Sequence, residues 1–172
     1  MKVSTKSKNA VAMLAFMGCF AQERVVPMER IEEKLKLSSS YCAQIMAELK
    51  NEGIVESKMG VGGGYFIPES ADFDELTVGD VCRAVEKDMY VLECVFDTSK
   101  CDLKKDAYKC SVREMMCDIS DVVFDALDSI YIKDISDMLE KNGLVNKADY
   151  LDREAIKDEN VGKKQIWNAW LD

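Results

Sequence analysis

The 172-residue sequence contains no histidine, and this absence restricts the chemistry open to the protein. It excludes Ser-His-Asp and Cys-His catalytic pairs, zinc sites built from helical histidines, and haem held by an axial histidine. No general base that works near neutral pH is evident, and no paired nucleophile is visible. An enzyme is therefore the class of protein that we least expect, and site chemistry is left to cysteine and carboxylate side chains.

A hydrophobic run long enough to span a bilayer is also missing from the sequence. The uncharged run over residues 10–21 follows three lysines and resembles an export signal, but it is too short to cross a membrane. Its apolar side chains repeat at helical spacing, with Ser4 and Thr5 as candidate caps, so it predicts a helix over residues 5–20. We expect a cytoplasmic protein without a membrane partner.

The seven cysteines lack the dense, even spacing of a small secreted disulfide scaffold. Their odd number fits reduced thiols better than a complete set of disulfides. Cys19, Cys42 and Cys82 fall within predicted helices and are interpreted as small core residues. The remaining four lie between positions 94 and 117.

Charge is distributed unevenly along the chain. The whole sequence has a net charge of −9, which ordinarily argues against a polyanionic partner. Residues 1–67, however, carry nine basic and seven acidic side chains, a net charge of +2, which leaves −11 for residues 68–172. This asymmetry indicates two parts with different roles and keeps nucleic acid open as a partner of the first part.

Two short helices joined by a tight turn are predicted in the first part of the chain. The first begins at Pro27, because proline suits the first helical position. The second begins at residues 38–39, two serines that can act as N-caps, and ends near Gly53. Two β-prone runs, 54–57 and 65–67, then surround a glycine-rich turn and predict a hairpin. A phosphate-binding loop is less favoured, since a strand follows the glycines and no Gly-Lys-Ser/Thr sequence is present.

A helix-turn-helix with such a wing can place its second helix in a major groove and its hairpin against the backbone or minor groove. Polar side chains at the start of that helix are candidates for base and phosphate contacts; they are Ser38, Ser39, Ser40, Tyr41 and Gln44. Lysines would supply phosphate contacts that release counterions; they are Lys2, Lys6, Lys8, Lys50 and Lys58. The alternative stays open, because winged helices also bind proteins and serines at a helix start are commonly only caps.

The second part of the chain predicts a linking helix and a long amphipathic helix. Thr77 and Asp80 have the spacing of a capping box that opens a helix to about residue 87, and residues 88–109 are irregular. Over 111–131 the apolar residues advance by threes and fours, and we expect this wide apolar face to pack on a second copy of the chain. The opposite face is acidic and is interpreted as solvated rather than metal-binding; it comprises Glu114, Asp118, Asp121, Asp125 and Asp128.

These elements predict a mainly α-helical fold with a small β-hairpin. The expected units are a winged helix-turn-helix domain (1–70), a linking helix, cysteine loop and dimerisation helix (71–140), and a C-terminal tail (141–172). A short helix is predicted over 132–141. Trp167 and Trp170 in the tail are expected to pack on the body of the protein.

Cys94, Cys101 and Cys110 are separated by six and eight residues in the irregular segment. Structural zinc prefers closer pairs, whereas loop cysteines at longer spacing suit a thiolate-bound iron-sulfur cluster. A fourth ligand is not apparent. Cys117 lies ~10 Å further along the helix and could serve only if the first turn unwinds; Glu114, Asp106 or a ligand from a partner subunit are the other candidates. Redox-sensitive thiols without a metal are an equally open interpretation.

Several motifs together resemble the IscR/NsrR, or Rrf-type, family of winged-helix regulators. They are the opening Met1-Lys2-Val3-Ser4-Thr5-Lys6, the stretch Ser38-Ser39-Ser40-Tyr41-Cys42-Ala43-Gln44, the wing Gly60-Val61-Gly62-Gly63-Gly64-Tyr65 and the segment Leu76-Thr77-Val78-Gly79-Asp80-Val81. Three cysteines and a long helix follow where that family has its cluster ligands and dimer interface. The resemblance covers roughly residues 1–140, and the combination is more specific than any one motif.

The resemblance implies a homodimeric bacterial transcription factor that binds a double-stranded DNA operator. Its DNA affinity would depend on a 2Fe-2S or 4Fe-4S cluster that senses iron-sulfur status, iron, nitric oxide or redox state. The implied cluster ligands are Cys94, Cys101 and Cys110. The implied DNA contacts are Ser40, Tyr41, Gln44 and the wing glycines Gly62, Gly63 and Gly64.

The chain departs from the family pattern at four positions. Arg113 stands where IscR-like members have a histidine ligand, and Lys8 stands where some nitric-oxide sensors supply an acidic ligand. Met59 replaces a common wing arginine, and Ala43 replaces a glutamate of some recognition helices. Two alternatives remain: a regulator of the same fold without a cluster, controlled by thiol oxidation, a small ligand or a protein partner, and a redox or interaction module that binds no DNA.

Overall fold

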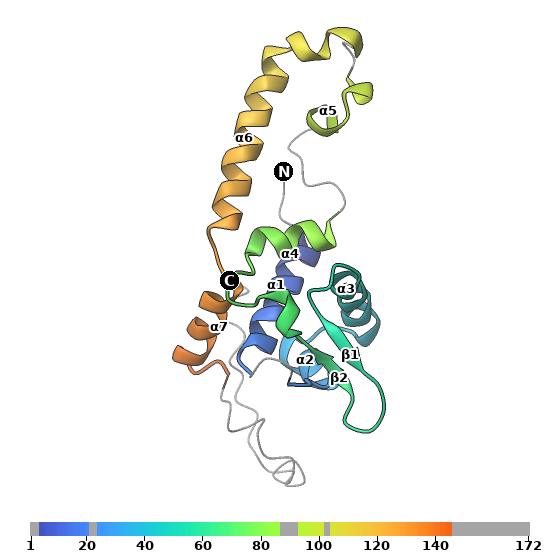
Figure 1. Ribbon diagram of the computed structural model, residues 1–172, viewed down its shortest axis with the longest axis vertical. Helices are drawn as coiled ribbons and strands as arrows, with labels where there is room; N and C mark the ends of the chain where they lie inside the picture. Colours follow the sequence, from blue (N-terminus) through green and yellow to red (C-terminus); the bar gives the residue numbers. More distant parts are fainter. Residues whose placement is uncertain (1–3, 21–23, 87–92, 102–103, 146–172) are drawn as a thin grey trace.

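The computed structural model describes residues 4–20, 24–86, 93–101 and 104–145. Within them, a helical body carries one long helix that extends away from it (Figure 1). The elements are α1 (Thr5–Gly18), α2 (Met28–Leu35), α3 (Ser39–Asn51), β1 (Glu56–Lys58), β2 (Gly64–Phe66), η1 (Glu69–Ala71), α4 (Val78–Val85), α5 (Glu93–Phe96), η2 (Thr98–Lys100), η3 (Lys104–Lys109), α6 (Ser111–Asp128) and α7 (Ile132–Lys141). The predicted fold class, mainly helical with a small hairpin, is confirmed.

Helices α1, α3 and α4 begin where the sequence predicts caps, whereas α2 begins at Met28 with Pro27 as its N-cap residue. The Ser4 hydroxyl accepts hydrogen bonds from the backbone N–H groups of Lys6 and Ser7, and Thr77 and Asp80 form both bonds of a capping box on α4. Each such cap typically contributes about 1 kcal/mol to stability. The left-handed residue Gly53, with φ +73°, follows the end of α3.

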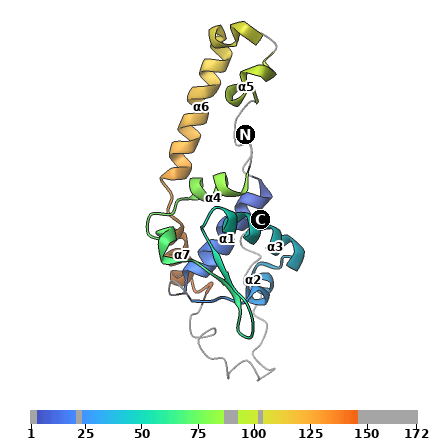
Figure 2. The same cartoon turned by 45° about the vertical axis from the view of Figure 1, so that its right-hand side comes forward.

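The core lies around α1, which passes through the middle of the body (Figure 2). Met13, Leu14 and Phe16 of α1 are fully buried, and Ile45 of α3 and Ile132 of α7 are fully buried in the same cluster. Burial of a side chain of this size contributes about 1.5–3 kcal/mol. The run that resembles an export signal is therefore the central helix of the fold.

The long helix α6 ends at Asp128, three residues before the predicted boundary. The physical reason is a short antiparallel bridge between Thr77 and Tyr131. The backbone N–H of Val78 donates to Ile130 O at 2.8 Å, and that of Ile132 donates to Leu76 O at 2.9 Å. These residues take extended backbone to pair with the segment before α4, and the helix cannot include them.

The hairpin is antiparallel, with Ser57 opposite Tyr65. A further bridge joins it to the segment before α2: the N–H of Val26 donates to Tyr65 O at 2.7 Å, and that of Tyr65 donates to Val26 O at 2.9 Å. Gly64 permits this approach, because its φ is +153° and a Cβ there would overlap the Val26 carbonyl. The wing is thus fixed to the start of the helix-turn-helix.

Close packing of α1 against α7 depends on Gly18. A Cβ at this position would overlap the ring of Phe73 and the hydroxyl of Ser136. We expect Gly18→Ala to lower the free energy of unfolding in urea by about 1–3 kcal/mol, since overpacking forces neighbours to shift. Phe73→Leu removes part of the obstructing ring, so the double variant should lose less stability than the two single variants combined. Simple additivity of the two losses would contradict this origin of the effect.

No helix among the described residues is long and apolar enough to cross a membrane. The predicted helix over 132–141 is confirmed as α7. Trp167 and Trp170 lie outside the described residues, as do Lys2 and residues 87–92.

Candidate functional site

The start of α3 presents polar side chains to solvent. Ser38, Ser39, Ser40 and Gln44 are exposed, and Tyr41 is half-buried against the core. Ser38 occupies the N-cap position as predicted, but its side chain forms no capping hydrogen bond with any residue that the structure describes. The Tyr41 N–H donates to the Ser38 carbonyl at 3.1 Å. The Ser38 hydroxyl is not used as a cap, and a helix N-terminus of this kind can bind phosphate.

The candidate lysines differ in how freely they can reach a polyanion. Lys6 forms an ion pair with Glu48 of α3 at 3.2 Å and is three-quarters buried. Lys50 donates to the Ser57 hydroxyl of β1 at 2.6 Å, which links the end of α3 to the wing while the side chain stays exposed. Lys8 and Lys58 are exposed. The structure thus gives Lys6 a packing role between α1 and α3.

The shape of the wing turn itself requires glycine at several positions. Gly60 and Gly62 have positive φ values of +96° and +75°. A Cβ on Gly63 would overlap the carbonyl of Lys58, and the Gly63 N–H donates to Gly60 O at 2.9 Å. These glycines shape a tight turn, whatever else they contact.

The three candidate ligand cysteines all lie between α4 and α6 and are half-buried. Cys94 is in α5, Cys101 follows η2, and Cys110 is the N-cap residue of α6. Among the described residues, no group of three histidine, cysteine or carboxylate side chains is close enough to hold a metal ion. The structure brings these cysteines into one segment without gathering their sulfur atoms.

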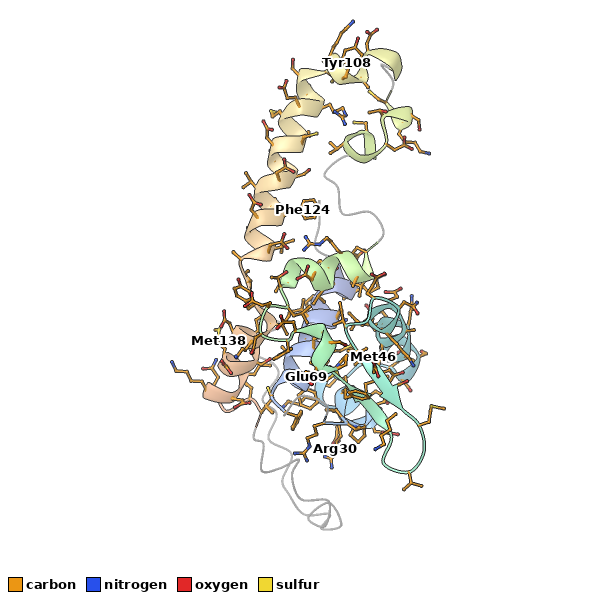
Figure 3. All side chains as sticks on the ribbon, viewed as in Figure 1. Arg30, Met46, Glu69, Tyr108, Phe124 and Met138 are labelled. Carbon is orange, nitrogen blue, oxygen red and sulfur yellow. The ribbon has the colours of Figure 1, made fainter. Side chains whose placement is uncertain are left out.

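Arg113 attaches this cysteine segment to the long helix. Its Nε donates to the carbonyl of Cys94 at 2.9 Å, and its Nη2 donates to that of Val95 at 3.1 Å. Arg113 therefore holds α5 against α6. Figure 3 shows this end of α6, near Tyr108, far from the body.

The other cysteines behave as predicted. Cys19, Cys42 and Cys82 are fully buried, which confirms them as core residues. Burial raises the pKa of the Cys42 thiol and of the Cys82 thiol, so both stay protonated near neutral pH. Cys117 is half-buried on α6.

A polar network joins the base of α6 to α4, and we call it the α4–α6 junction. Arg83 bonds Asp128 through Nη2 at 2.7 Å and Nη1 at 3.1 Å, and bonds Asp80 at 2.7 Å. These bonds raise the pKa of Arg83. Burial would raise the pKa of Asp80, but hydrogen bonds from Thr77 and Arg83 outweigh it and lower the value. The Asp80 carboxylate is therefore ionised at neutral pH.

Asp128 corrects one expectation from the sequence. The acidic face of the long helix is exposed at Glu114, Asp118, Asp121 and Asp125, as predicted. Asp128 instead pairs with Arg83 and lies so close to Gly79 that a Cβ there would overlap it. The sequence does not reveal this pair because 45 residues separate its members; the available signal is that Arg83 lies three residues after the capping-box Asp80.

Comparison with known proteins adds a decisive observation. A family model described as "Rrf2: Iron-dependent Transcriptional regulator" matches residues 3–138. The chain belongs to the Rrf2 family. The family membership that the sequence motifs imply is thus confirmed, together with the winged-helix fold.

Individual Rrf2 relatives agree with this assignment. The HTH-type transcriptional regulator IscR of Pectobacterium atrosepticum is 27% identical over 174 residues, which cover 99% of this chain and 99% of that protein. CymR of B. subtilis, titled a global cysteine regulator, is 26% identical with a TM-score of 0.62 over 80% of this chain and 98% of its own. T. potens IscR shares the fold at 24% identity and a TM-score of 0.58, over 87% of this chain and 96% of its own.

These relatives are transcriptional regulators and not enzymes, as predicted from the lack of histidine. The protein is an IscR-like transcriptional regulator of the Rrf2 family. In helix-turn-helix regulators the second helix of the motif lies in the major groove, and α3 has that place in this fold.

Proposed function

We propose that this Rrf2 regulator binds a double-stranded DNA operator as a homodimer, and that an iron-sulfur cluster held by Cys94, Cys101 and Cys110 controls its affinity. The carrying observation is the position of these thiols. They lie on the segment that connects α4 of the body to α6, and Arg113 attaches that segment to α6. Because chromosomal DNA is its target, we place the protein in the cytoplasm.

The long helix supports the homodimer. Phe124 and Leu127, near the base of α6, pack against the core. Further along, apolar side chains are exposed to solvent although they share one amphipathic helix; they are Val112 (56%), Met115 (48%), Ile119 (42%) and Val122 (68%). A contiguous apolar stripe of this kind favours an isologous contact with a second copy.

The side chains of this segment are of the type that binds an iron-sulfur cluster. Such clusters are held by cysteine thiolates, and three half-buried thiols lie on one segment. Arg113 cannot supply a fourth ligand, because a guanidinium carries five N–H donors and no acceptor lone pair. When bound, the cluster would supply a covalent link between the three cysteines that is sensitive to iron and redox state. Since the described sulfur atoms do not form a group, the segment must close to bind it.

A movement of the cysteine segment can be transmitted to the DNA-binding elements through contacts within this chain. Movement of α5 shifts its carbonyl contacts with Arg113 and hence the upper part of α6. At its base, α6 is fixed to α4 by the Arg83–Asp128 pair and the Thr77–Tyr131 bridge. In a dimer, a change in the tilt of α6 would alter the spacing of the two α3 helices, which must match the operator half-sites.

Absorption spectroscopy tests the cofactor directly. Protein purified without oxygen should be brown and should contain iron and acid-labile sulfide, and the colour should be lost on replacement of any of the three cysteines. Protein that stays colourless and free of iron after anaerobic reconstitution would contradict cluster binding.

A cluster-free thiol sensor is the second candidate. Two observations favour it: the described cysteines are not grouped, and the chain is similar to CymR, the global cysteine regulator of B. subtilis. In this case the colourless protein should lose titratable thiols on oxidation, with a parallel change in DNA affinity. Thiol counts on native protein before and after peroxide treatment distinguish the two candidates.

The α4–α6 junction should be needed for the response but not for folding. Arg83→Met removes an exposed ion pair, so the free energy of unfolding should change by less than about 1 kcal/mol. The ratio of the DNA affinities of the cluster-loaded and cluster-free forms should fall several-fold, as measured by fluorescence anisotropy. Lys133→Met, which removes the exposed pair with Asp74 at 2.5 Å, is the matched control and should keep the ratio. A full response in Arg83→Met would contradict this role.

A further inference from the structure

The tip of the wing exposes two apolar side chains almost completely. Met59 is 90% exposed and Val61 is 111% exposed, the largest values for large hydrophobic residues in the described part of the chain. They stand on either side of Gly60, in the loop between β1 and β2 that projects from the body (Figure 1). Single exposed apolar residues are common, but two on one preformed projecting turn point to a contact.

The turn itself does not need these two side chains. Its shape is set by the positive φ values of Gly60 and Gly62 and by the hydrogen bond from the Gly63 N–H to Gly60 O. The strands are held by the hairpin register and by the Val26–Tyr65 bridge. Met59 and Val61 are therefore presented on a rigid support rather than used to build it.

The charge of the wing tip and its connection to α3 indicate which partner covers it. Residues 57–64 include one lysine, the exposed Lys58, and no acidic residue, although the whole chain has a net charge of −9. Lys50 links the end of α3 to Ser57 of β1, so the wing is continuous with the helix that contacts DNA in this fold. A tip without negative charge, beside that helix, fits a DNA groove.

We propose that Met59 and Val61 form an apolar wedge that enters the minor groove and partly unstacks a base step. This rests on the DNA binding proposed above and identifies two residues that determine specificity. Charged wing residues read a narrow, electronegative groove, whereas apolar wedges require a step that opens easily. The wing should accordingly select flexible pyrimidine–purine steps and disfavour stiff A-tracts.

The salt dependence of binding separates an apolar wedge from phosphate contacts. The probe is a duplex that the protein itself selects from a random-sequence library, titrated at several salt concentrations. Met59→Ala combined with Val61→Ala should weaken binding by about tenfold or more, because burial of apolar side chains is lost. The slope of log affinity against log salt should stay unchanged. Lys58→Gln removes one lysine from each of the two subunits and should reduce the slope by about 1.8.

Two further measurements use the same duplex. Energy transfer between dyes at its ends should report a bend with the native protein and a smaller bend with the double alanine variant. Replacing the pyrimidine–purine step under the wing with an A-tract should weaken binding of the native protein but not of that variant. Met59→Arg is the matched control, and it should increase the salt slope and restore tolerance of the A-tract.

The outcomes are distinct. If the double alanine variant binds the selected duplex with native affinity and bend, the wedge is excluded while DNA binding itself stands. A reduced salt slope in that variant would also exclude it, because the lost contacts would then be electrostatic. Absence of any salt-dependent DNA binding by the native protein would instead contradict the proposed function.

Discussion

Replacing Cys94, Cys101 or Cys110 by serine should abolish the difference in DNA affinity between the cluster-loaded and cluster-free forms. In the native protein, we expect cluster-loaded and cluster-free forms to differ in affinity by about 5–150-fold, the usual range of coupling between two sites. Each serine variant should give a ratio near unity. The reason is that serine oxygen does not replace thiolate sulfur toward iron or in thiol oxidation.

A neighbouring serine provides the control for this experiment. Ser111 is exposed, begins α6, and lies next to Cys110 in the chain. Ser111→Ala should retain the native ratio. Serine variants that keep the full response would show that the signal enters elsewhere in the molecule.

The second large effect concerns the exposed apolar stripe of α6. Val122 is 68% exposed and lies in the second half of the helix. Val122→Asp should convert the dimer to a monomer, because each subunit would bury an unpaired carboxylate in the apolar contact. Affinity for a two-half-site duplex should then fall by about 10²–10⁴-fold, since the second half-site is no longer bound intramolecularly.

The acidic face of the same helix offers a matched substitution. Asp121 is exposed and is the immediate neighbour of Val122. Asp121→Asn should leave both the dimer and the DNA affinity unchanged in sedimentation and anisotropy measurements. A Val122→Asp protein that sediments as a dimer would place the subunit contact outside this stripe.

Local patterns in the sequence predicted much of the fold. The capping box at Thr77 and Asp80 and the bounds of α7 agree with the structure, because caps and helical periodicity depend on neighbouring residues. The end of α6 differs, because its last predicted turn pairs with a segment more than fifty residues away. A contact between distant segments leaves no local pattern to read.

The same distinction applies to the candidate site. Lys6 looks like a free cation in the sequence, yet it pairs with Glu48, 42 residues away. Arg113 is visible only as a departure from a histidine ligand, while the structure gives it hydrogen bonds to the carbonyls of Cys94 and Val95. Residue types predict which residues belong to the candidate site, but only the structure shows which partner each charged group has.

Control of DNA binding by the cysteine segment is tested most directly by one titration. The native protein, purified without oxygen, is titrated into the selected duplex by fluorescence anisotropy, before and after removal of iron with a chelator. We predict dissociation constants that differ by about fivefold or more. Equal dissociation constants for the iron-loaded and iron-stripped protein would contradict control by an iron-sulfur cluster.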